Sequence, residues 1–360
     1  MDHWSFPKER PIVARVSLKA IAHNLQVAKI KAPSSKIYAV LKANAYGHGL
    51  VRILPALSQA DGFCVLTLEE AFVLRERSEK PIVLLEGVYR PKDWQHCSTH
   101  HFAAVLHQRE QLQSLLKAPL EKPLTIFLKI NTGMNRLGFS TQSVPEIAAL
   151  LKNAGHAIVL MTHFASADEE NGIERQFHVF QSATASLGMP VSVANSAALL
   201  KHMHAHGDIV RAGIMLYGVS PFSEYTGMDL GLKPALHLIS AIVAIHDIEQ
   251  GERVGYGGEF VAPHDMRIGI VAAGYADGYV RASPTGTPVL VENQKTRIIG
   301  RISMDKMAVD LTAVPSARLF SPVMLWGEAL PVEEVARSAG TIAYELLAGL
   351  SSRVPVIIDG

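Results

Sequence analysis

The sequence predicts an α/β fold, a (β/α)8 TIM-type barrel over residues 1–232, followed by a mainly β domain over residues 233–360. Two observations support this prediction. Short apolar runs alternate with amphipathic stretches up to about residue 217, whereas strand-like runs follow one another with few helices after about residue 232. A chain of 360 residues has room for both parts, since one domain usually takes ~100–200 residues.

Eight apolar runs are the predicted barrel strands. They cover residues 37–41, 62–66, 82–85, 102–105, 124–130, 158–162, 191–194 and 208–211. The helices between them are also visible, because Leu50, Ile53 and Leu57 share one helical face and Thr67 with Glu70 has the spacing of a capping box. Eight β/α units predict a closed parallel barrel, whose functional groups lie at the carboxyl ends of its strands.

The second half of the chain has the pattern of a β domain. Its predicted strands cover residues 242–248, 267–272, 289–291, 297–299, 307–311, 323–326 and 354–358. Residues 221–233, with Gly227 and Gly231, are the predicted linker. Residues 1–16 contain an early apolar run at 12–16, which is a candidate to pair with this second domain.

Composition excludes several classes of partner. The formal net charge is +1, from 34 basic and 33 acidic side chains, so neither nucleic acid nor an acidic membrane is an expected partner. The first ten residues lack the apolar core of a signal peptide, and no apolar run approaches the ~20 residues of a membrane helix. We therefore expect a cytoplasmic protein with a small-molecule substrate. Cys64 and Cys97 suggest neither a disulfide framework nor a metal site.

Lys42 ends the first predicted barrel strand and is the last inward-facing group on it. A lysine in this position loses solvation, so its pKa falls and its free amine can attack an aldehyde, as a Schiff-base lysine does. The alternative is a lysine that extends into solvent from an exposed strand end.

Further polar residues end other barrel strands. Asn135 and Arg136 follow the fifth strand, Thr162 and His163 the sixth, Asn195 and Ser196 the seventh, and Arg211 closes the eighth. Since these ends share one rim, the amides and hydroxyl at Ser196 suit a phosphate, and Gly213 with Ile214 offers further amides. The alternative for Asn195 and Ser196 is an ordinary helix cap. A phosphate site and an aldehyde-binding lysine together predict pyridoxal 5'-phosphate as the cofactor.

Seven segments in order along the chain resemble the alanine racemases. They are residues 39–49 (AVLKANAYGHG), 129–139 (KINTGMNRLGF), 162–165 (THFA), 211–218 (RAGIMLYG), 253–257 (RVGYG), 274–278 (GYADG) and 303–305 (SMD). The resemblance extends over nearly the whole chain. It implies a pyridoxal-phosphate-dependent enzyme that interconverts L-alanine and D-alanine.

The resemblance also implies how the cofactor is held. Lys42 would bind the aldehyde. The implied phosphate contacts are Tyr46, Ser196 and the amides of Gly213 and Ile214, with His163 and Asn195 beside the ring. Arg211 would face the pyridine nitrogen, and because an arginine keeps its own proton, the nitrogen would stay unprotonated and the ring would be a weaker electron sink. An ion pair between Arg211 and Asp208 is the structural alternative.

Racemisation needs a base on each face of a planar intermediate. The resemblance assigns one face to Lys42 and the other to Tyr256 of the partner subunit, in a homodimer with shared active sites. It further implies substrate contacts at Arg136, Met304 and Tyr275, an entrance lined by Asp168, Arg281 and Arg301, and a carbamylated lysine at Lys129. Two positions depart from the family pattern: Ser352 replaces a phosphate-contacting tyrosine, and Asn131 stands where aspartate is common.

Other functions remain open from the sequence. The product would supply peptidoglycan with D-alanine or enter alanine catabolism, and a broader racemase would also accept serine. A non-catalytic pyridoxal-phosphate-binding barrel would share Lys42, and a decarboxylase would use an acidic group in place of Arg211. A metal hydrolase is the remaining alternative, because His202, His204 and His206 have a spacing that can ligate zinc.

Overall fold

The computed structural model describes residues 9–170 and 172–359, which form two compact units. The barrel unit comprises Ala22–Ala45 and Gly49–Leu216. The β unit comprises Tyr46–His48 and the described parts of Met1–Ile21 and Tyr217–Gly360. Helix α1 (Leu18–Lys31) has residues in both units.

Eight parallel strands form the barrel unit's sheet. They are β2 (Lys36–Val40), β3 (Gly62–Val65), β4 (Ile82–Leu84), β5 (Phe102–Leu106), β6 (Thr125–Lys129), β7 (Ala157–Met161), β8 (Val191–Ser192) and β9 (Ile209–Ala212), in the order β8-β7-β6-β5-β4-β3-β2-β9. At the seam, the Arg211 N–H donates to the Ala194 carbonyl at 3.0 Å and the Asp208 N–H to Val191 at 3.1 Å. The predicted parallel barrel is confirmed, and it is nearly closed.

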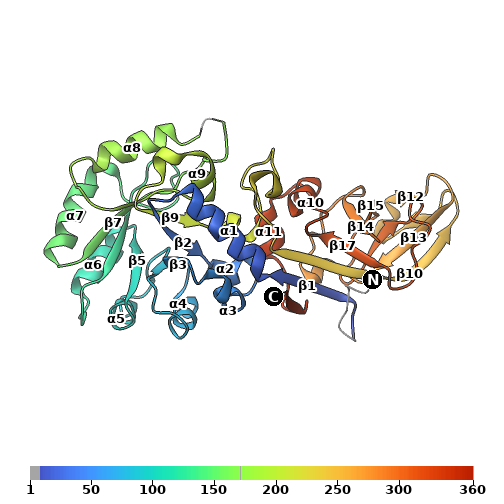
Figure 1. The fold of residues 1–360 in the computed structure, drawn as a ribbon, viewed down its shortest axis with the longest axis horizontal. Helices are drawn as coiled ribbons and strands as arrows, with labels where there is room; N and C mark the ends of the chain where they lie inside the picture. Colours follow the sequence, from blue (N-terminus) through green and yellow to red (C-terminus); the bar gives the residue numbers. More distant parts are fainter. Residues whose placement is uncertain (1–8, 171, 360) are drawn as a thin grey trace. The chain divides into compact units, whose positions relative to one another are not determined.

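Helices cover the outside of this barrel (Figure 1). They include α3 (Leu50–Ile53), α4 (Leu68–Arg75), α5 (Asp93–Thr99), α6 (Arg109–Lys117), α7 (Val144–Asn153), α8 (Glu174–Thr184) and α9 (Ser196–Lys201). The predicted capping box opens α4: Thr67 Oγ1 accepts the Glu70 N–H at 3.3 Å, and Glu70 Oε2 accepts the Thr67 N–H at 3.4 Å. This cap sets the point where the chain turns from β3 into the helix.

Alternation along β2 decides which side chains enter the barrel lumen. Successive side chains of a strand point to opposite faces, so Lys36, Tyr38 and Val40 share the inward face while Ile37 packs outward. Gly62 on β3 accommodates the Tyr38 ring, because a Cβ at Gly62 would lie 2.8 Å from its carbon atoms. The inward row of β2 therefore starts at Lys36, at one end of the lumen, and Lys42 follows the strand at the other end.

The β unit contains the second large sheet. Its strands are β1 (Ile12–Ser17), β10 (Leu236–Ile248), β13 (Met266–Val271), β14 (Pro288–Val291), β15 (Gln294–Ile299), β16 (Met307–Asp310), β17 (Pro322–Trp326) and β18 (Val356–Asp359), with a separate pair β11 (Arg253–Val254) and β12 (Phe260–Val261). Strands β10, β17, β14, β15, β16 and β13 pair in this order, and β13 pairs back with β10. The fold class therefore includes the expected mainly β part.

The early run at residues 12–16 lies in this sheet. β1 pairs antiparallel with β10 and parallel with β18. Residues 1–8 of the predicted pairing segment lie outside the described residues. The predicted linker, residues 221–233, lies within the β unit. Glu333 on α10 (Val332–Ser338) accepts the N–H of Gly227 in this segment at 2.8 Å and, through the same oxygen, the N–H of the preceding Ser220 at 2.9 Å. Helix α11 (Ala343–Ala348) follows. In the described part of the chain, no helix is long and apolar enough to span a membrane.

Candidate active site

Lys42 lies two residues after β2, at the carboxyl end of the barrel, and is half-buried. Burial lowers the pKa of Lys42, and the charge of Arg136 lowers it further, whereas Glu86 opposes the shift. The strand-end position thus has the effect expected from the sequence, a larger fraction of free amine than an exposed lysine has.

The backbone after Lys42 is left-handed over four residues. Ala43, Asn44, Ala45 and Tyr46 have φ between 51° and 54°, which costs a non-glycine residue roughly 1–2 kcal/mol. The strained turn is held by a hydrogen bond from the Ala45 N–H to the Leu41 carbonyl at 2.8 Å, and the Asn44 side chain accepts the Leu50 N–H at 2.9 Å. The sequence analysis missed this turn, because alanine has no preference for such a conformation.

Tyr46, at the end of this turn, belongs to the β unit. It is buried, and its ring stacks on Tyr217 with centroids 4.8 Å apart and lies 6.0 Å from Tyr344. These aromatic neighbours restrict the phenol that the sequence assigned to the phosphate. Ser352, the residue that departs from the family pattern, is exposed.

Lys129 is the inward group at the end of β6 and is only 7% exposed. Burial lowers its pKa to about 8, and the nearby charges of Arg211 and Arg136 act in the same direction. Lys42, Lys129, Arg136 and Arg211 thus place four cationic side chains around one rim of the barrel unit. Among the described residues, Glu86 is the carboxylate that raises the pKa of both Lys42 and Lys129. Such a rim attracts an anion, including a phosphate or a carboxylate.

Arg211 is buried inside the barrel, 4% exposed, and burial lowers its pKa to about 10. Its guanidinium donates to the Ser192 carbonyl at 2.7 Å, the Ser192 hydroxyl at 2.8 Å and the Thr162 carbonyl at 2.9 Å. The alternative ion pair with Asp208 does not form, since Asp208 Oδ2 accepts the Val191 N–H instead. Neutral oxygens therefore orient a cation that keeps its charge at neutral pH.

His163 follows β7 and is half-buried. Burial lowers its pKa well below the usual range, and the charges of Arg211 and Lys129 lower it further. The imidazole is therefore neutral at physiological pH. A neutral, flat ring among cations can pack against an aromatic cofactor without adding a fifth positive charge.

The phosphate-binding residues predicted around α9 come together in the barrel unit. Asn195 caps the helix, since its side-chain oxygen accepts the Ala198 N–H at 3.0 Å. Ser196 Oγ accepts the Gly213 N–H at 2.8 Å, which joins the start of α9 to the segment before Ile214. The hydroxyl proton of Ser196 stays available to an anion, so the residues fit a phosphate group. The ordinary cap and the anion site are compatible, because they use different atoms.

Gln176 on α8 is a site residue that the sequence did not indicate. Its side-chain oxygen accepts the Ala165 N–H at 2.7 Å, and its amide donates to Thr132 Oγ1 at 3.0 Å and to the His163 carbonyl at 3.3 Å. Thr132 in turn contacts Thr162 Oγ1 at 2.8 Å. One glutamine therefore joins the loops after β6 and β7, which carry Arg136 and His163, and no local pattern around residue 176 signals this.

Asn131 shapes the loop that carries Arg136. Its side-chain oxygen accepts the N–H groups of Gly133 and Asn135, both at 3.1 Å, in a local turn that an aspartate could also form. The amide of Asn131 also donates to Asn135 Oδ1 at 2.9 Å, a hydrogen bond that an aspartate could not make. Asp168, predicted at the entrance, is exposed in the same unit.

The β unit holds the remaining predicted residues on exposed loops. Tyr256 is 70% exposed on a turn whose flanking Gly255 and Gly257 have φ of 76° and 73°. Met304 and Tyr275 lie on two loops joined by hydrogen bonds from the Tyr275 N–H to Ser303 at 3.1 Å and from the Ala276 N–H to Met304 at 3.0 Å. Arg301 pairs with Glu259, and Arg281 also acts on that carboxylate.

The buried carboxylate of Asp277 anchors these loops. It accepts from Gly274 N–H at 2.8 Å, from Arg10 at 2.7 Å and from Arg353 at 3.0 Å. Gly274 must be glycine here, since a Cβ would lie 2.4 Å from the Met304 carbonyl oxygen. Asp277 is therefore a positioning residue for Tyr275 and Met304 that the sequence analysis named only as part of a motif.

The three histidines considered as zinc ligands make separate contacts. His202 faces the Ala167 carbonyl at 3.2 Å, His206 the Leu199 carbonyl at 2.9 Å, and His204 pairs with Glu174 at 3.1 Å. No metal-binding group of three or more His, Cys, Asp or Glu residues is found among residues 9–170 and 172–359. The three histidines therefore do not converge on one metal site, although their spacing in the sequence would allow it.

Known proteins match this chain over nearly its whole length, including the residues of the site. Two family models match, alanine racemase, N-terminal domain, over residues 16–221, and alanine racemase, C-terminal domain, over residues 235–358. An alanine racemase of Nitrosomonas eutropha is 48% identical over 97% of this chain and 99% of its own, and a catabolic alanine racemase of Salmonella typhimurium is 46% identical over the same shares. The structure of the biosynthetic alanine racemase from Pseudomonas aeruginosa matches with a TM-score of 0.96 and 43% identity, over 98% of this chain and 100% of the other.

The left-handed turn predicts that Ala43→Gly stabilises the protein. Glycine adopts positive φ without steric cost, so the free energy of unfolding should rise by about 1 kcal/mol. The matched control is Ala149→Gly on the exposed face of α7, where the same change should lower it by about 1 kcal/mol. Urea denaturation measures both, and a loss of stability at both positions would contradict a left-handed Ala43.

The lowered pKa of Lys129 predicts that this residue makes stability depend on pH in CO2-free buffer. Its folded pKa of about 8 lies below the ordinary 10.5, so between these values the unfolded chain binds a proton at this lysine that the folded chain does not, and the contribution of Lys129 to stability rises with pH by up to about 3 kcal/mol. Lys129→Met should remove this contribution, so that the stability of wild type relative to the variant rises with pH, whereas Lys152→Met on exposed α7 should keep the pH dependence of wild type. Urea midpoints across this pH range measure it, and an identical rise in the Lys129 variant would refute the assignment.

Proposed function

The chain belongs to the alanine racemase family, and from that premise we propose that it interconverts L-alanine and D-alanine with pyridoxal 5'-phosphate as cofactor. The observation that carries the proposal is the cationic rim of the barrel unit, where the half-buried amine of Lys42 has a lowered pKa. An unprotonated amine beside an anion site is what an aldehyde cofactor with a phosphate group requires. Alanine is the proposed substrate because the homologues are named for it.

The residues around the rim suit this cofactor. We assign the phosphate to Tyr46, Ser196, Gly213 and Ile214, the ring faces to His163 and Asn195, and the ring nitrogen to Arg211. The bound cofactor would supply an electron-withdrawing ring that makes the α-hydrogen of the amino acid acidic. Arg211 would offer the nitrogen an N–H but no transferable proton, because neutral oxygens orient it and it stays charged. This favours return of a proton to carbon over side reactions that need a stronger electron sink.

Two bases would exchange the α-hydrogen, one on each face. Lys42 supplies the first, and Tyr256 of the partner subunit the second, in a homodimer with shared sites. The exposure of Tyr256 on a glycine turn supports this role, since its phenol is accessible to another chain. The substrate carboxylate would bind Arg136 and the Met304 N–H, with Tyr275 beside it. Asp168, Arg281 and Arg301 would line the entrance.

Lys129 is a candidate for carbamylation. CO2 reacts with a neutral amine, forming an N–C bond and releasing a proton, and a pKa of about 8 leaves a sizeable neutral fraction at physiological pH. The resulting carbamate would turn one cation of the rim into an anion. Its natural partner is Arg136, whose charge contributes to the lowered pKa of Lys129. Carbamylation would thereby orient Arg136 toward the substrate carboxylate.

The cellular role that we propose is cytoplasmic supply of D-alanine for peptidoglycan, with alanine catabolism as the second role. Both are represented among the relatives, one named biosynthetic and another catabolic. A broader racemase that also accepts serine is a second candidate activity. A non-catalytic cofactor-binding barrel fits less well, because the chain also carries a β unit with Tyr256 and Met304 on exposed loops.

Lys42→Ala tests the function directly. Purified wild type with added pyridoxal 5'-phosphate should racemise alanine and turn yellow as the cofactor bonds to lysine. The variant should lose the yellow absorbance and at least about 1,000-fold in racemisation rate. Lys36→Ala, at the opposite, amino end of β2, is the matched control and should retain both. Activity and colour that survive in the Lys42 variant would rule out this lysine, and a panel including serine defines specificity.

Hybrid dimers test the shared site. Refolding Lys42→Ala chains with Tyr256→Phe chains should restore roughly a quarter of wild-type activity, because about half of the dimers are hybrids and each has one intact site. Each variant alone should be nearly inactive. Affinity tags on the two chains verify hybrid formation. Purified hybrids without racemase activity would exclude a site made of Lys42 and Tyr256 of the partner subunit.

A further inference from the structure

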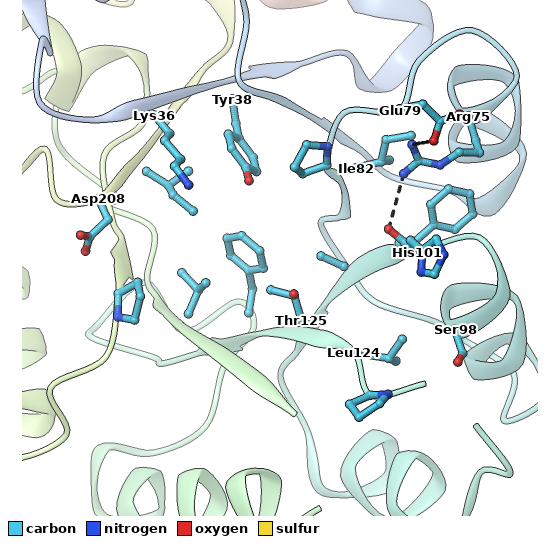
Figure 2. Close-up of a pocket in the computed structure, with 18 of the residues that line it drawn as sticks. Lys36, Tyr38, Arg75, Glu79, Ile82, Ser98, His101, Leu124, Thr125 and Asp208 are labelled. Carbon is cyan, nitrogen blue, oxygen red and sulfur yellow. Dashed lines mark hydrogen bonds and ion pairs between the residues drawn. The ribbon is translucent and has the colours of Figure 1, made fainter. Parts of the chain in front are cut away.

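A cavity opens at the amino-terminal ends of the barrel strands (Figure 2). Lys42 follows the opposite, carboxyl end of β2. The volume of the cavity is about 750 Å³, within the range of small-molecule sites. It is lined within the barrel unit by Lys36 and Tyr38 on β2, Phe127 on β6, Val159 on β7, and Asp208 and Ile209 at the start of β9. None of these residues takes part in the racemase site.

Tyr38 presents its hydroxyl to this cavity. The residue is 7% exposed, its ring crosses Gly62, and Figure 2 shows the hydroxyl directed into the open space. Burial raises its pKa to about 12, so it remains a hydrogen-bond donor at neutral pH. Among residues 9–170 and 172–359, no hydrogen bond to this hydroxyl is found. The hydroxyl can therefore donate to a molecule bound in the cavity.

Two opposite charges stand at the cavity mouth without pairing. The Lys36 N–H donates to the Asp208 carbonyl at 2.8 Å, so their side chains leave neighbouring strand ends. No ion pair joins the Lys36 amine to the Asp208 carboxylate in the described part of the chain. Asp208 Oδ2 accepts the Val191 N–H at 2.7 Å. In contrast, the other charged pair of the cavity, Arg75 and Glu79, is neutralised internally at 3.8 Å.

Charge balance selects the class of ligand. A simple carboxylate would bind Lys36 but meet the charge of Asp208, and a simple amine would bind Asp208 but meet the charge of Lys36. A zwitterion satisfies both groups. Phe127, Val159 and Ile209 are buried beneath these charges and provide an apolar wall, and the volume exceeds the need of alanine.

We propose that this cavity binds a free α-amino acid with an apolar side chain larger than that of alanine. The carboxylate contacts the Lys36 ammonium and the Tyr38 hydroxyl, the ammonium contacts Asp208, and the side chain packs on Phe127 and Val159. Because exposed ion pairs contribute little, the affinity is expected in the millimolar range. This site is independent of the proposed racemase function and would exist without it.

Three probes that differ by one charge test the ligand class: L-phenylalanine, 3-phenylpropanoate without the amine, and 2-phenylethylamine without the carboxylate. Methyl NMR on the full chain should show L-phenylalanine shifting the Ile209 and Val159 signals, which report on this cavity and not on the racemase site. Each analogue should bind about 3-fold more weakly or worse. Equal affinity for 3-phenylpropanoate, or no shift up to the solubility limit of L-phenylalanine, would overturn the proposal.

Conservative variants test the contacts. Lys36→Gln and Asp208→Asn should each weaken L-phenylalanine binding about 3-fold, and Tyr38→Phe, which keeps the ring over Gly62, should weaken it by about the same factor. Lys152→Gln on exposed α7 is the matched control and should change nothing. Thermal melting verifies that each variant folds. Unchanged affinity in all three cavity variants would place the binding elsewhere and refute the site.

Discussion

The buried guanidinium of Arg211 holds the barrel together where its backbone pairing is weakest. Strand β8 has only two residues, and within residues 9–170 and 172–359 no ladder joins it to β9. Arg211 compensates from β9 by donating to the Ser192 carbonyl and hydroxyl on β8 and to the Thr162 carbonyl after β7. Loss of the guanidinium would leave these buried oxygens unpaired, at roughly 1–3 kcal/mol each. One side chain thus closes the barrel and presents a charge at its rim.

The same charge sets the chemistry of the neighbouring groups. It contributes to the lowered pKa of Lys129 and of His163, so it helps to keep an amine and an imidazole neutral. The two ends of the lumen differ accordingly. The carboxyl ends of the strands carry several cations and suit an anion. The amino ends carry Lys36 and Asp208, which have opposite charges and suit a zwitterion. Tyr38, whose register partner on β9 is Arg211, lies on the inward face between Lys36 and Val40.

Local strain and distant hydrogen bonds both fix the predicted site residues. The left-handed turn from Ala43 to Tyr46 follows the reactive lysine directly, and strain of this kind persists only where surrounding contacts enforce it. Gln176 joins the loops after β6 and β7. Asp277 anchors the loops of Tyr275 and Met304 because its buried carboxylate pairs with Arg10 and Arg353. The side chains that would touch a ligand therefore depend on residues that would not.

Sequence alone determined the barrel, the β part, the capping box at Thr67 and the position of Lys42 at a strand end, because periodicity and turn residues act over a few neighbouring positions. The tertiary structure decided the left-handed Ala43, the depth of Lys129, the hydrogen bond between Ser196 and Gly213, and the cavity below Tyr38. These features depend on groups far apart in the chain: Gln176 acts on Thr132, and Gly62 makes room for Tyr38. Burial and strain arise only when such residues meet, so no local pattern encodes them.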